Sequence, residues 1–163
     1  MNGIIIVNKE KGMTSHDVVN QIRKIFQTKK VGHLGTLDPN ATGILAICIN
    51  DATKLVQFLV EHDKTYIARV CLGKKTDTYD LDGNIIDSAK VEKIDVEELD
   101  TILQDFIGKQ LQVPPIYSSI KVNGKKLYEY ARNNEKIEIL PREIEVYHIK
   151  RISELIYEND CCF

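Results

Sequence analysis

The segment from Gly32 to Gly43, GHLGTLDPNATG, constrains this chain more than any other part of its sequence. Its three glycines and one proline disfavour a helix or a central strand, so we predict a loop over residues 31–43. Pro39 biases Asp38 toward an extended backbone, and the glycines permit tight turns or the close approach of a ligand. From these residues alone a surface turn is the favoured interpretation, and a ligand-contacting aspartate is the alternative.

The segments on either side of this loop predict a single α+β domain. A chain of 163 residues is long enough to form one domain with its own core. Strand and helix patterns are mixed without a regular βαβ alternation, which favours the α+β class. The expected strands lie at 3–7, 44–49, 64–72, 116–122 and 144–156.

Local signals mark where the helices begin. Ser15 is the expected N-cap of the first helix, and Asp95 with Glu98 resembles a capping box that opens a later one. The apolar residues expected on the inner faces are Val18, Val19, Ile22, Ile25 and Phe26 in the first helix, Ala52, Leu55, Val56 and Leu59 in a short second helix, and Val96, Leu99, Ile102, Leu103 and Phe106 in the third. Three further signals predict a turn, a strand end and a hairpin: Asp82-Gly83, Pro114-Pro115 and Asn123-Gly124.

Composition excludes several classes of protein. With 43% hydrophobic and 28% charged residues, the chain has the make-up of an ordinary folded protein. It has no apolar run near the ~20 residues of a membrane-spanning helix, and its first residues lack the basic start of a signal peptide. A cytoplasmic protein without a membrane partner is therefore expected. The four cysteines include no C-x-x-C pair, so neither a metal site nor a disulfide framework is expected.

The net charge of −2 does not favour a nucleic-acid partner, because domains that bind RNA usually carry a basic surface. Local basic clusters do occur, at Lys29-Lys30, at Lys74-Lys75 and around Lys121, Lys125, Lys126 and Arg132. From charge alone, such lysines more often form a solvated face than a phosphate-binding groove.

Four stretches in order give the loop a more specific interpretation: Gly32 to Leu45, Lys64 to Ala68, Thr76 to Gly83, and Gln112 to Lys121. They resemble the motifs G-H-x-G-T-L-D-P-x-A-x-G-x-L, K-x-Y-x-A, T-D-T-x-D-x-x-G and Q-x-P-P-x-Y-S-A-x-K of the TruB family of tRNA pseudouridine synthases. The resemblance covers nearly the whole chain, and it favours a functional Asp38 over the surface turn.

The resemblance implies a pseudouridine synthase-like fold, with a mixed, mainly antiparallel sheet and flanking helices. It also implies conversion of uridine 55 in the tRNA T-loop to pseudouridine, without a cofactor or a metal. Asp38 is then the catalytic carboxylate, acting either as a nucleophile or as a general base. The implied substrate-binding residues are His33, Tyr66, Lys64, Asp77, Tyr117 and Lys121. Tyr66 would stack on a base flipped out of the RNA; without the resemblance it would be assigned to the core.

Members of the family continue beyond the matched region into a strand pair with a K-G-T-Y-I-R-like motif and then, usually, a small PUA domain. Residues 1–163 are thus expected to form the N-terminal portion of a catalytic domain, truncated after Phe163. The arginine of the absent motif is the expected ion-pair partner of Asp38, so this portion assayed alone is expected to be inactive.

The sequence leaves two alternative functions. The first is a non-catalytic RNA-binding or RNA-chaperone module of the same fold, which would have no need of a carboxylate facing phosphates. The second is an N-glycoside hydrolase, whose chemistry usually takes two cooperating carboxylates, whereas the loop offers only Asp38.

Overall fold

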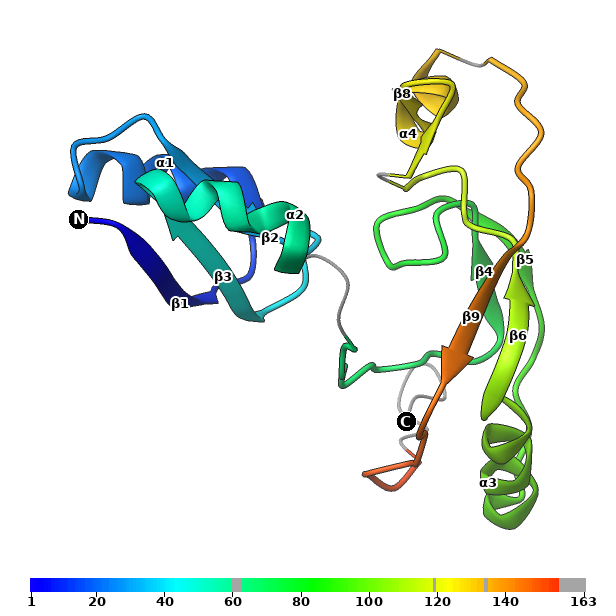
Figure 1. Cartoon of the computed structure of the whole chain (residues 1–163). Helices are drawn as coiled ribbons and strands as arrows, with labels where there is room; N and C mark the ends of the chain where they lie inside the picture. The colour runs from blue at the N-terminus through cyan, green and yellow to red at the C-terminus, as the bar shows by residue number, and fades with distance from the viewer. Residues whose placement is uncertain (60–62, 119, 134, 156–163) are drawn as a thin grey trace. The chain divides into compact units, whose positions relative to one another are not determined.

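A computed structural model describes residues 1–59, 63–118, 120–133 and 135–155. The chain forms two compact units, Met1–Tyr66 and Ile67–Phe163 (Figure 1). Every strand pairing in the described residues is antiparallel, and helices accompany the strands in both units, which confirms the α+β class. Within the described part of the chain, no helix combines the length and the apolar character needed to cross a membrane.

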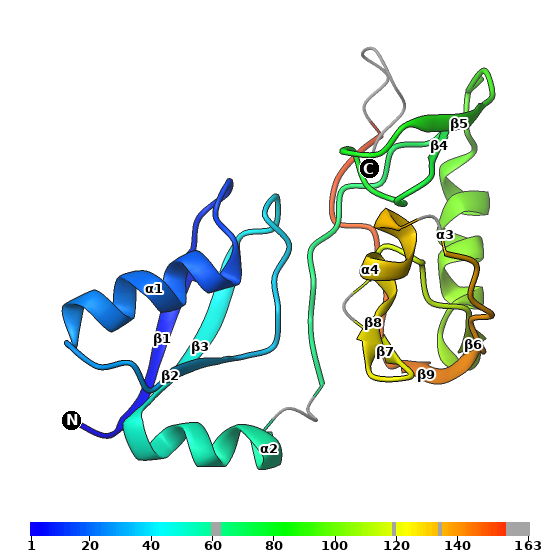
Figure 2. The ribbon, with the colours of Figure 1, turned by 90° about the horizontal axis from the view of Figure 1, so that it is seen from above.

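The first unit is a three-stranded sheet in the order β1-β3-β2, with a helix across one face (Figure 2). Its elements are β1 (Gly3–Lys9), α1 (Ser15–Ile25), β2 (Val31–Leu34), β3 (Gly43–Ile49), η1 (Asn50–Leu55) and α2 (Val56–Leu59). The central strand β3 carries the fully buried Ile47, which faces Ile5 of β1 and His33 of β2 in the register. The core cluster between sheet and helix contains Val18, Val19, Ile22, Val31, Leu45, Ile47 and Ile49.

The first helix begins one residue earlier than the sequence signals predict. Thr14, not Ser15, is the N-cap: its hydroxyl accepts from the Asp17 backbone N–H, and the Asp17 carboxylate accepts from the Thr14 N–H. The Thr14 hydroxyl and the Thr14 backbone N–H both donate to the Asp17 carboxylate, and these hydrogen bonds hold the pKa of Asp17 below its ordinary value. Ser15 is the first helical residue. The predicted inner face holds at Val18, Val19 and Ile22, whereas Ile25 is 69% exposed.

The predicted loop over 31–43 is too long at its start, because residues 31–34 pair with β3 as the edge strand β2. Val31 is buried in the core cluster, and that burial together with the ladder hydrogen bonds outweighs the local signal of Gly32. The short helix after β3 does form, partly as a 3-10 turn, but only Ala52 of its four expected apolar residues is buried.

In its described residues, the second unit contains three antiparallel strand pairs and two helices. Its elements are β4 (Lys74–Thr76), β5 (Ile85–Ser88), α3 (Val96–Asp105), β6 (Gly108–Gln112), β7 (Lys121–Val122), β8 (Lys125–Lys126), α4 (Leu127–Arg132) and β9 (Arg142–Val146). The Asn123-Gly124 hairpin is confirmed between β7 and β8, and both residues adopt positive φ, as a type I′ turn requires. The strand before Pro114-Pro115 ends at Gln112, as expected.

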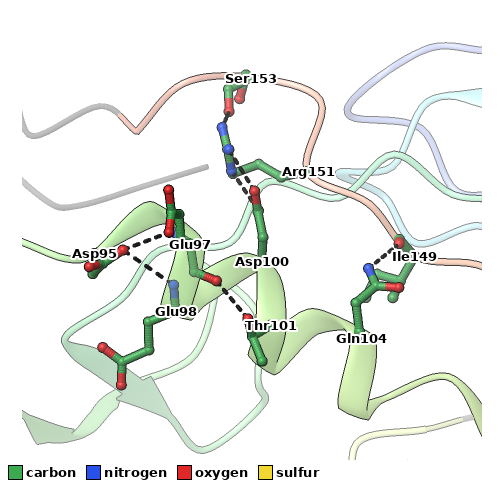
Figure 3. Close-up of polar contacts among 9 residues, drawn as sticks. All are labelled: Asp95, Glu97, Glu98, Asp100, Thr101, Gln104, Ile149, Arg151 and Ser153. Atoms are coloured by element: carbon green, nitrogen blue, oxygen red, sulfur yellow. Dashed lines mark hydrogen bonds and ion pairs between the residues drawn. The ribbon is translucent and has the colours of Figure 1, made fainter.

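Helix α3 begins at the predicted place, with Asp95 as its N-cap, accepting from the backbone N–H groups of Glu97 and Glu98 (Figure 3). The return hydrogen bond of a capping box, from the Glu98 side chain, does not form among the described residues. Of its expected apolar face only Leu99 is buried. The polar side of the helix is instead hydrogen-bonded to a later segment of the chain, which contains Ile149 and Arg151. Arg151 forms two hydrogen bonds with the Asp100 carboxylate, both 2.9 Å long, and Gln104 donates to the Ile149 carbonyl oxygen (Figure 3).

Three predicted strands are shorter or absent. Of the strand expected at 116–122, only Lys121–Val122 forms among the described residues, as β7. Residues 63–70 adopt no regular secondary structure and are all exposed, although their sequence alternates as a strand would. Alternation specifies a strand only where a partner strand supplies the ladder hydrogen bonds, and no described segment pairs with this one. The last predicted strand is β9, which ends at Val146; residues 147–155 are irregular, and Ile156 lies outside the described residues.

Candidate active site

The loop between β2 and β3 places Asp38 at the first position of a β-turn. The backbone N–H of Ala41 donates to the Asp38 carbonyl oxygen at 3.0 Å, and Pro39 takes the second position. Asn40 does not have the positive φ of a type II turn, so the geometry fits type I, which favours Asp at the first position and Pro at the second. The side chain of Asp38 is exposed, and no hydrogen bond or ion pair from the described residues of its unit reaches the carboxylate.

On the N-terminal side of Asp38, the peptide of Leu37 is held by Ser15. The Ser15 hydroxyl accepts from the Leu37 backbone N–H at 2.9 Å and donates to the Leu37 carbonyl oxygen at 3.1 Å. Ser15 is 3% exposed, and the side chain of Leu37 packs against the core cluster. The loop is therefore attached to helix α1 immediately before the aspartate.

On the C-terminal side of Asp38, the carbonyl oxygen of Pro39 accepts two hydrogen bonds. One comes from the Gly12 backbone N–H at 2.8 Å, and the other from the Nζ of Lys9 at 3.3 Å. Lys9 is 1% exposed, and its ammonium also donates to the carbonyl oxygens of Glu10 and Met13. The exposed carboxylate of Asp38 thus lies between two fixed residues.

Sequence reasoning missed Lys9 and Ser15 as parts of this site. A signal for Lys9 was present, since the period of two along β1 puts Lys9 on the same inward face as Ile5 and Val7. A buried lysine at such a position needs acceptors, and a glycine-rich loop offers free carbonyl groups. No comparable signal identified Ser15, because Thr14 and Ser15 are both good capping residues.

His33 lies on β2, just before the Asp38 loop. Its Nδ1 is hydrogen-bonded to the Gly35 carbonyl oxygen. Because a carbonyl oxygen only accepts, Nδ1 carries the hydrogen, and Nε2 of the neutral ring is left as an acceptor. This contact fixes the ring at the start of the loop. His33 and Asp38 therefore lie close together along the chain, at the start and in the turn of the same loop.

Tyr66 and Lys64 belong to the irregular segment that ends the first unit. Tyr66 is 67% exposed, so the assignment of its ring to the core is wrong. An exposed aromatic ring is available for stacking, which is what the sequence motif predicts. Lys64 is also exposed.

Asp77 closes the loop between β4 and β5. Its Oδ1 accepts from the Asn84 backbone N–H at 2.9 Å, and its Oδ2 accepts from the Asn84 side-chain amide at 3.2 Å. Gly83 packs so closely that a Cβ there would overlap Asp77 Oδ1 and Thr78 Oγ1. The contacts of Asp77 are structural, and its predicted contact with substrate stays a prediction.

The described residues contain no cluster of three or more His, Cys, Asp or Glu placed to hold a metal ion.

Tyr117 and Lys121 belong to a compact hairpin–helix module, residues 117–118 and 120–133, built from β7, β8 and α4. The Ser118 and Ile120 carbonyl oxygens accept from the first backbone N–H groups of α4, and the Tyr130 hydroxyl donates to the Val122 carbonyl oxygen. Leu127 is fully buried beneath these contacts. Tyr117 is 44% exposed and Lys121 is exposed, so both side chains are accessible.

Three cations of the hairpin–helix module lie over aromatic rings of the same module. Lys126 and Arg132 both lie 5.3 Å from the ring centroid of Tyr128, and Lys125 lies 4.5 Å from that of Tyr130. Lys125 is also paired with Glu135 at 2.7 Å, and its hydrogen bonds hold the pKa of Glu135 below its ordinary value. Lys121 lies directly opposite Lys126 in the strand pairing, which concentrates positive charge on this module despite the net charge of the chain.

Comparisons with known proteins agree with the motifs. Residues 23–158 match the family model described as TruB family pseudouridylate synthase (N terminal domain). The chain is 52% identical to tRNA pseudouridine synthase B of Staphylococcus saprophyticus, over 99% of the chain and 53% of that protein. It is 48% identical to tRNA pseudouridine synthase B of Bacillus pumilus, over 98% of the chain and 52% of that protein. The chain thus spans about half the length of these relatives.

The fold also has solved counterparts. The crystal structure of a Cbf5-Nop10-Gar1 complex contains a chain that is similar with a TM-score of 0.63 and 26% identity. The match covers 98% of the present chain and 37% of that chain.

Proposed function

This chain belongs to the TruB family of pseudouridylate synthases, and from that membership we propose that the protein isomerises a uridine of tRNA to pseudouridine, with Asp38 as the catalytic carboxylate. The proposed target is uridine 55 in the T-loop. No redox partner is needed, since substrate and product are isomers.

The proposed reaction exchanges one bond of the base for another. The N1–C1′ glycosidic bond breaks, the uracil turns over and C5 bonds to C1′. The hydrogen that C5 carried leaves as a proton, and the freed N1 takes up a proton, so the product is an isomer of the substrate. An ionised carboxylate serves this sequence either by attacking the sugar as a nucleophile or by taking a proton as a general base. Both roles require that the carboxylate be held at one place and remain open to the substrate.

The environment of Asp38 is the observation that carries the proposal. Ser15 holds the peptide before it, Lys9 and Gly12 hold the carbonyl group of the residue after it, and the carboxylate itself is exposed. A carboxylate that served the fold would be expected to accept hydrogen bonds, as Asp77 does from Asn84. A frame that fixes the backbone and leaves the side chain open is the arrangement a reacting group needs.

Recognition of the tRNA T-arm is assigned to the accessible aromatic and basic side chains. Tyr66 supplies a ring for stacking on the flipped base, and His33 offers Nε2 as a hydrogen-bond acceptor near the same loop. The paired Lys121 and Lys126 offer a place where an RNA phosphate would relieve the repulsion of like charges.

The test is Asp38→Asn in the complete gene product, assayed by the release of the C5 hydrogen from tRNA labelled at uridine C5. We expect no release above background, with a thermal midpoint close to that of the wild type, because the carboxylate has no hydrogen-bond partner to lose within its unit. Asp87→Asn is the matched control: it removes an exposed carboxylate of β5 and should keep wild-type turnover. Substantial turnover by Asp38→Asn would overturn the assignment. A wild-type protein that binds tRNA without turnover would favour the RNA-chaperone alternative.

A further inference from the structure

We infer that Ser15 is a positioning residue that fixes the orientation of Asp38 through the peptide of Leu37, an inference that rests on the proposed function. The contact is unusual because one hydroxyl serves both backbone groups of the same residue. Ser15 accepts from the Leu37 N–H at 2.9 Å and donates to the Leu37 carbonyl oxygen at 3.1 Å.

The carbonyl group of Leu37 lies in the same planar peptide unit as the nitrogen of Asp38. A hydrogen bond that fixes this carbonyl oxygen therefore fixes the plane from which the Asp38 Cα projects. The next peptide plane is fixed too, because the Asp38 carbonyl oxygen accepts from the Ala41 N–H at 3.0 Å. With both flanking planes held, the carboxylate retains only the rotations of its own side chain.

Ser15 is itself held by a rigid element. It is the first residue of α1, is 3% exposed, and is followed by Val18 and Val19 in the core cluster. Its hydroxyl contributes nothing to capping α1, since the Thr14 hydroxyl already accepts from the Asp17 N–H. An alanine at position 15 would keep the helix, because alanine has the highest helix propensity. The substitution would instead remove the two hydrogen bonds that hold Leu37 in the loop that carries Asp38.

Thr14 and Ser15 thus form a matched pair for an experiment, because they are adjacent hydroxyl residues with different partners. Thr14→Ala removes the cap of α1 and should lower the thermal midpoint while leaving the Leu37 contact in place. Ser15→Ala removes the Leu37 contact while leaving the cap in place.

The first measurement is the kinetics of C5-hydrogen release by the complete gene product. For Ser15→Ala we expect kcat to fall by about 10- to 100-fold with KM for tRNA within about 3-fold, since a shift of about 1 Å in a reacting group costs up to that factor. Thr14→Ala, assayed below its unfolding transition, should keep kcat within about 2-fold of wild type. Ser15→Thr restores the hydroxyl and should recover most of kcat. If Ser15→Ala does not fold, Ser15→Cys replaces it, since a thiol is a weaker hydrogen-bonding group.

The second measurement is hydrogen exchange at the Leu37 amide, which reports on the contact without any catalysis. Ser15→Ala should raise the exchange rate of this amide, and Thr14→Ala should not. A wild-type protein that releases no C5 hydrogen overturns the proposed function and this role with it. If the wild type releases the C5 hydrogen but Ser15→Ala matches Thr14→Ala in kcat or in the exchange rate of the Leu37 amide, the role of Ser15 is overturned. The proposed function then stands.

Discussion

The Nζ atom of Lys9 lies 3.3 Å from the carbonyl oxygen of Pro39, so a buried cation holds the backbone of the residue that follows Asp38. The same ammonium donates to the carbonyl oxygens of Glu10 at 3.0 Å and Met13 at 2.7 Å. An ammonium has three hydrogens to donate, and here each has an acceptor. A lysine buried to this extent is rare unless its charge is satisfied in this way.

The first prediction concerns the stability that this lysine supplies. Lys9→Met keeps the apolar stem but leaves the carbonyl groups of Glu10 and Met13 without the ammonium donor. We expect the free energy of unfolding to fall by about 2–4 kcal/mol, the usual cost of breaking a buried hydrogen-bond network. Urea unfolding measures this change. Lys11→Met, which alters an exposed lysine nearby, should change it by less than about 0.5 kcal/mol, and equal effects would contradict the role of Lys9.

Two strands of the first unit could be predicted because residues 3–7 and 44–49 are short, nearly continuous apolar runs, which are typical of buried strands. Burial alternates along β1 as far as Lys9, whereas Ile47, Cys48 and Ile49 of the central strand β3 are all buried. Alternation of side chains was the signal at 64–72, and there residues 64–70 form no strand. Alternation specifies a strand only where a partner strand supplies the ladder hydrogen bonds, and no described strand pairs with residues 64–70.

Of the candidate site, the sequence predicted Asp38 but not the residues that hold its loop. Ser15 lies 22 positions from Leu37 in sequence, and Lys9 lies 30 positions from Pro39. No local pattern shows that Ser15 bonds to Leu37 or that Lys9 reaches Pro39, because both contacts depend on the packing of α1 and β1 beside the loop. The choice of Thr14 over Ser15 as the N-cap follows from the same contact, since the hydroxyl of Ser15 is already occupied.

The second prediction tests Tyr66 as a stacking platform. An aromatic ring contributes about 1–3 kcal/mol per stacked base by alanine substitution, so its loss should be large. Tyr66→Leu should therefore reduce kcat/KM by about 5- to 150-fold, whereas Tyr66→Phe, which keeps the ring, should stay near wild type. Because Tyr66 is 67% exposed, neither variant should alter the thermal midpoint appreciably. Wild-type rates for both variants would exclude stacking, and an equal loss in both would point to the hydroxyl.

The third prediction concerns the charge on the hairpin–helix module. Lys121→Ala should weaken tRNA binding and reduce the slope of log K against log salt concentration by about one, the signature of one lost phosphate contact. Filter binding over a series of salt concentrations measures both quantities. Lys90→Ala removes an exposed lysine outside this module and should leave the slope unchanged. Identical slopes for wild type and Lys121→Ala would show that Lys121 does not meet a phosphate.

The fourth prediction is a dependence of stability on pH that arises from α3. The two hydrogen bonds from Arg151 hold the pKa of Asp100 below its ordinary value of 3.8, and the same contact raises the pKa of Arg151. Arg151 therefore stays charged throughout, and only Asp100 titrates. A carboxyl group with a lowered folded-state pKa contributes its stability above the unfolded value, and this contribution is lost as the pH falls through the folded value. The loss should begin below about pH 4.

Asp100→Asn tests this assignment, because it removes the titrating group while keeping a side chain of similar size. The thermal midpoint of the variant should fall less steeply below about pH 4 than that of the wild type, and the two curves should converge at the most acid end. Added salt should narrow the gap at neutral pH, since the Asp100 side chain is 45% exposed and its attraction to Arg151 is screened. Asp105→Asn, at the end of the same helix, removes a carboxylate with no ion pair among the described residues. If it flattens the acid limb as much as Asp100→Asn does, the effect belongs to the charge of α3 and not to the Arg151 contact.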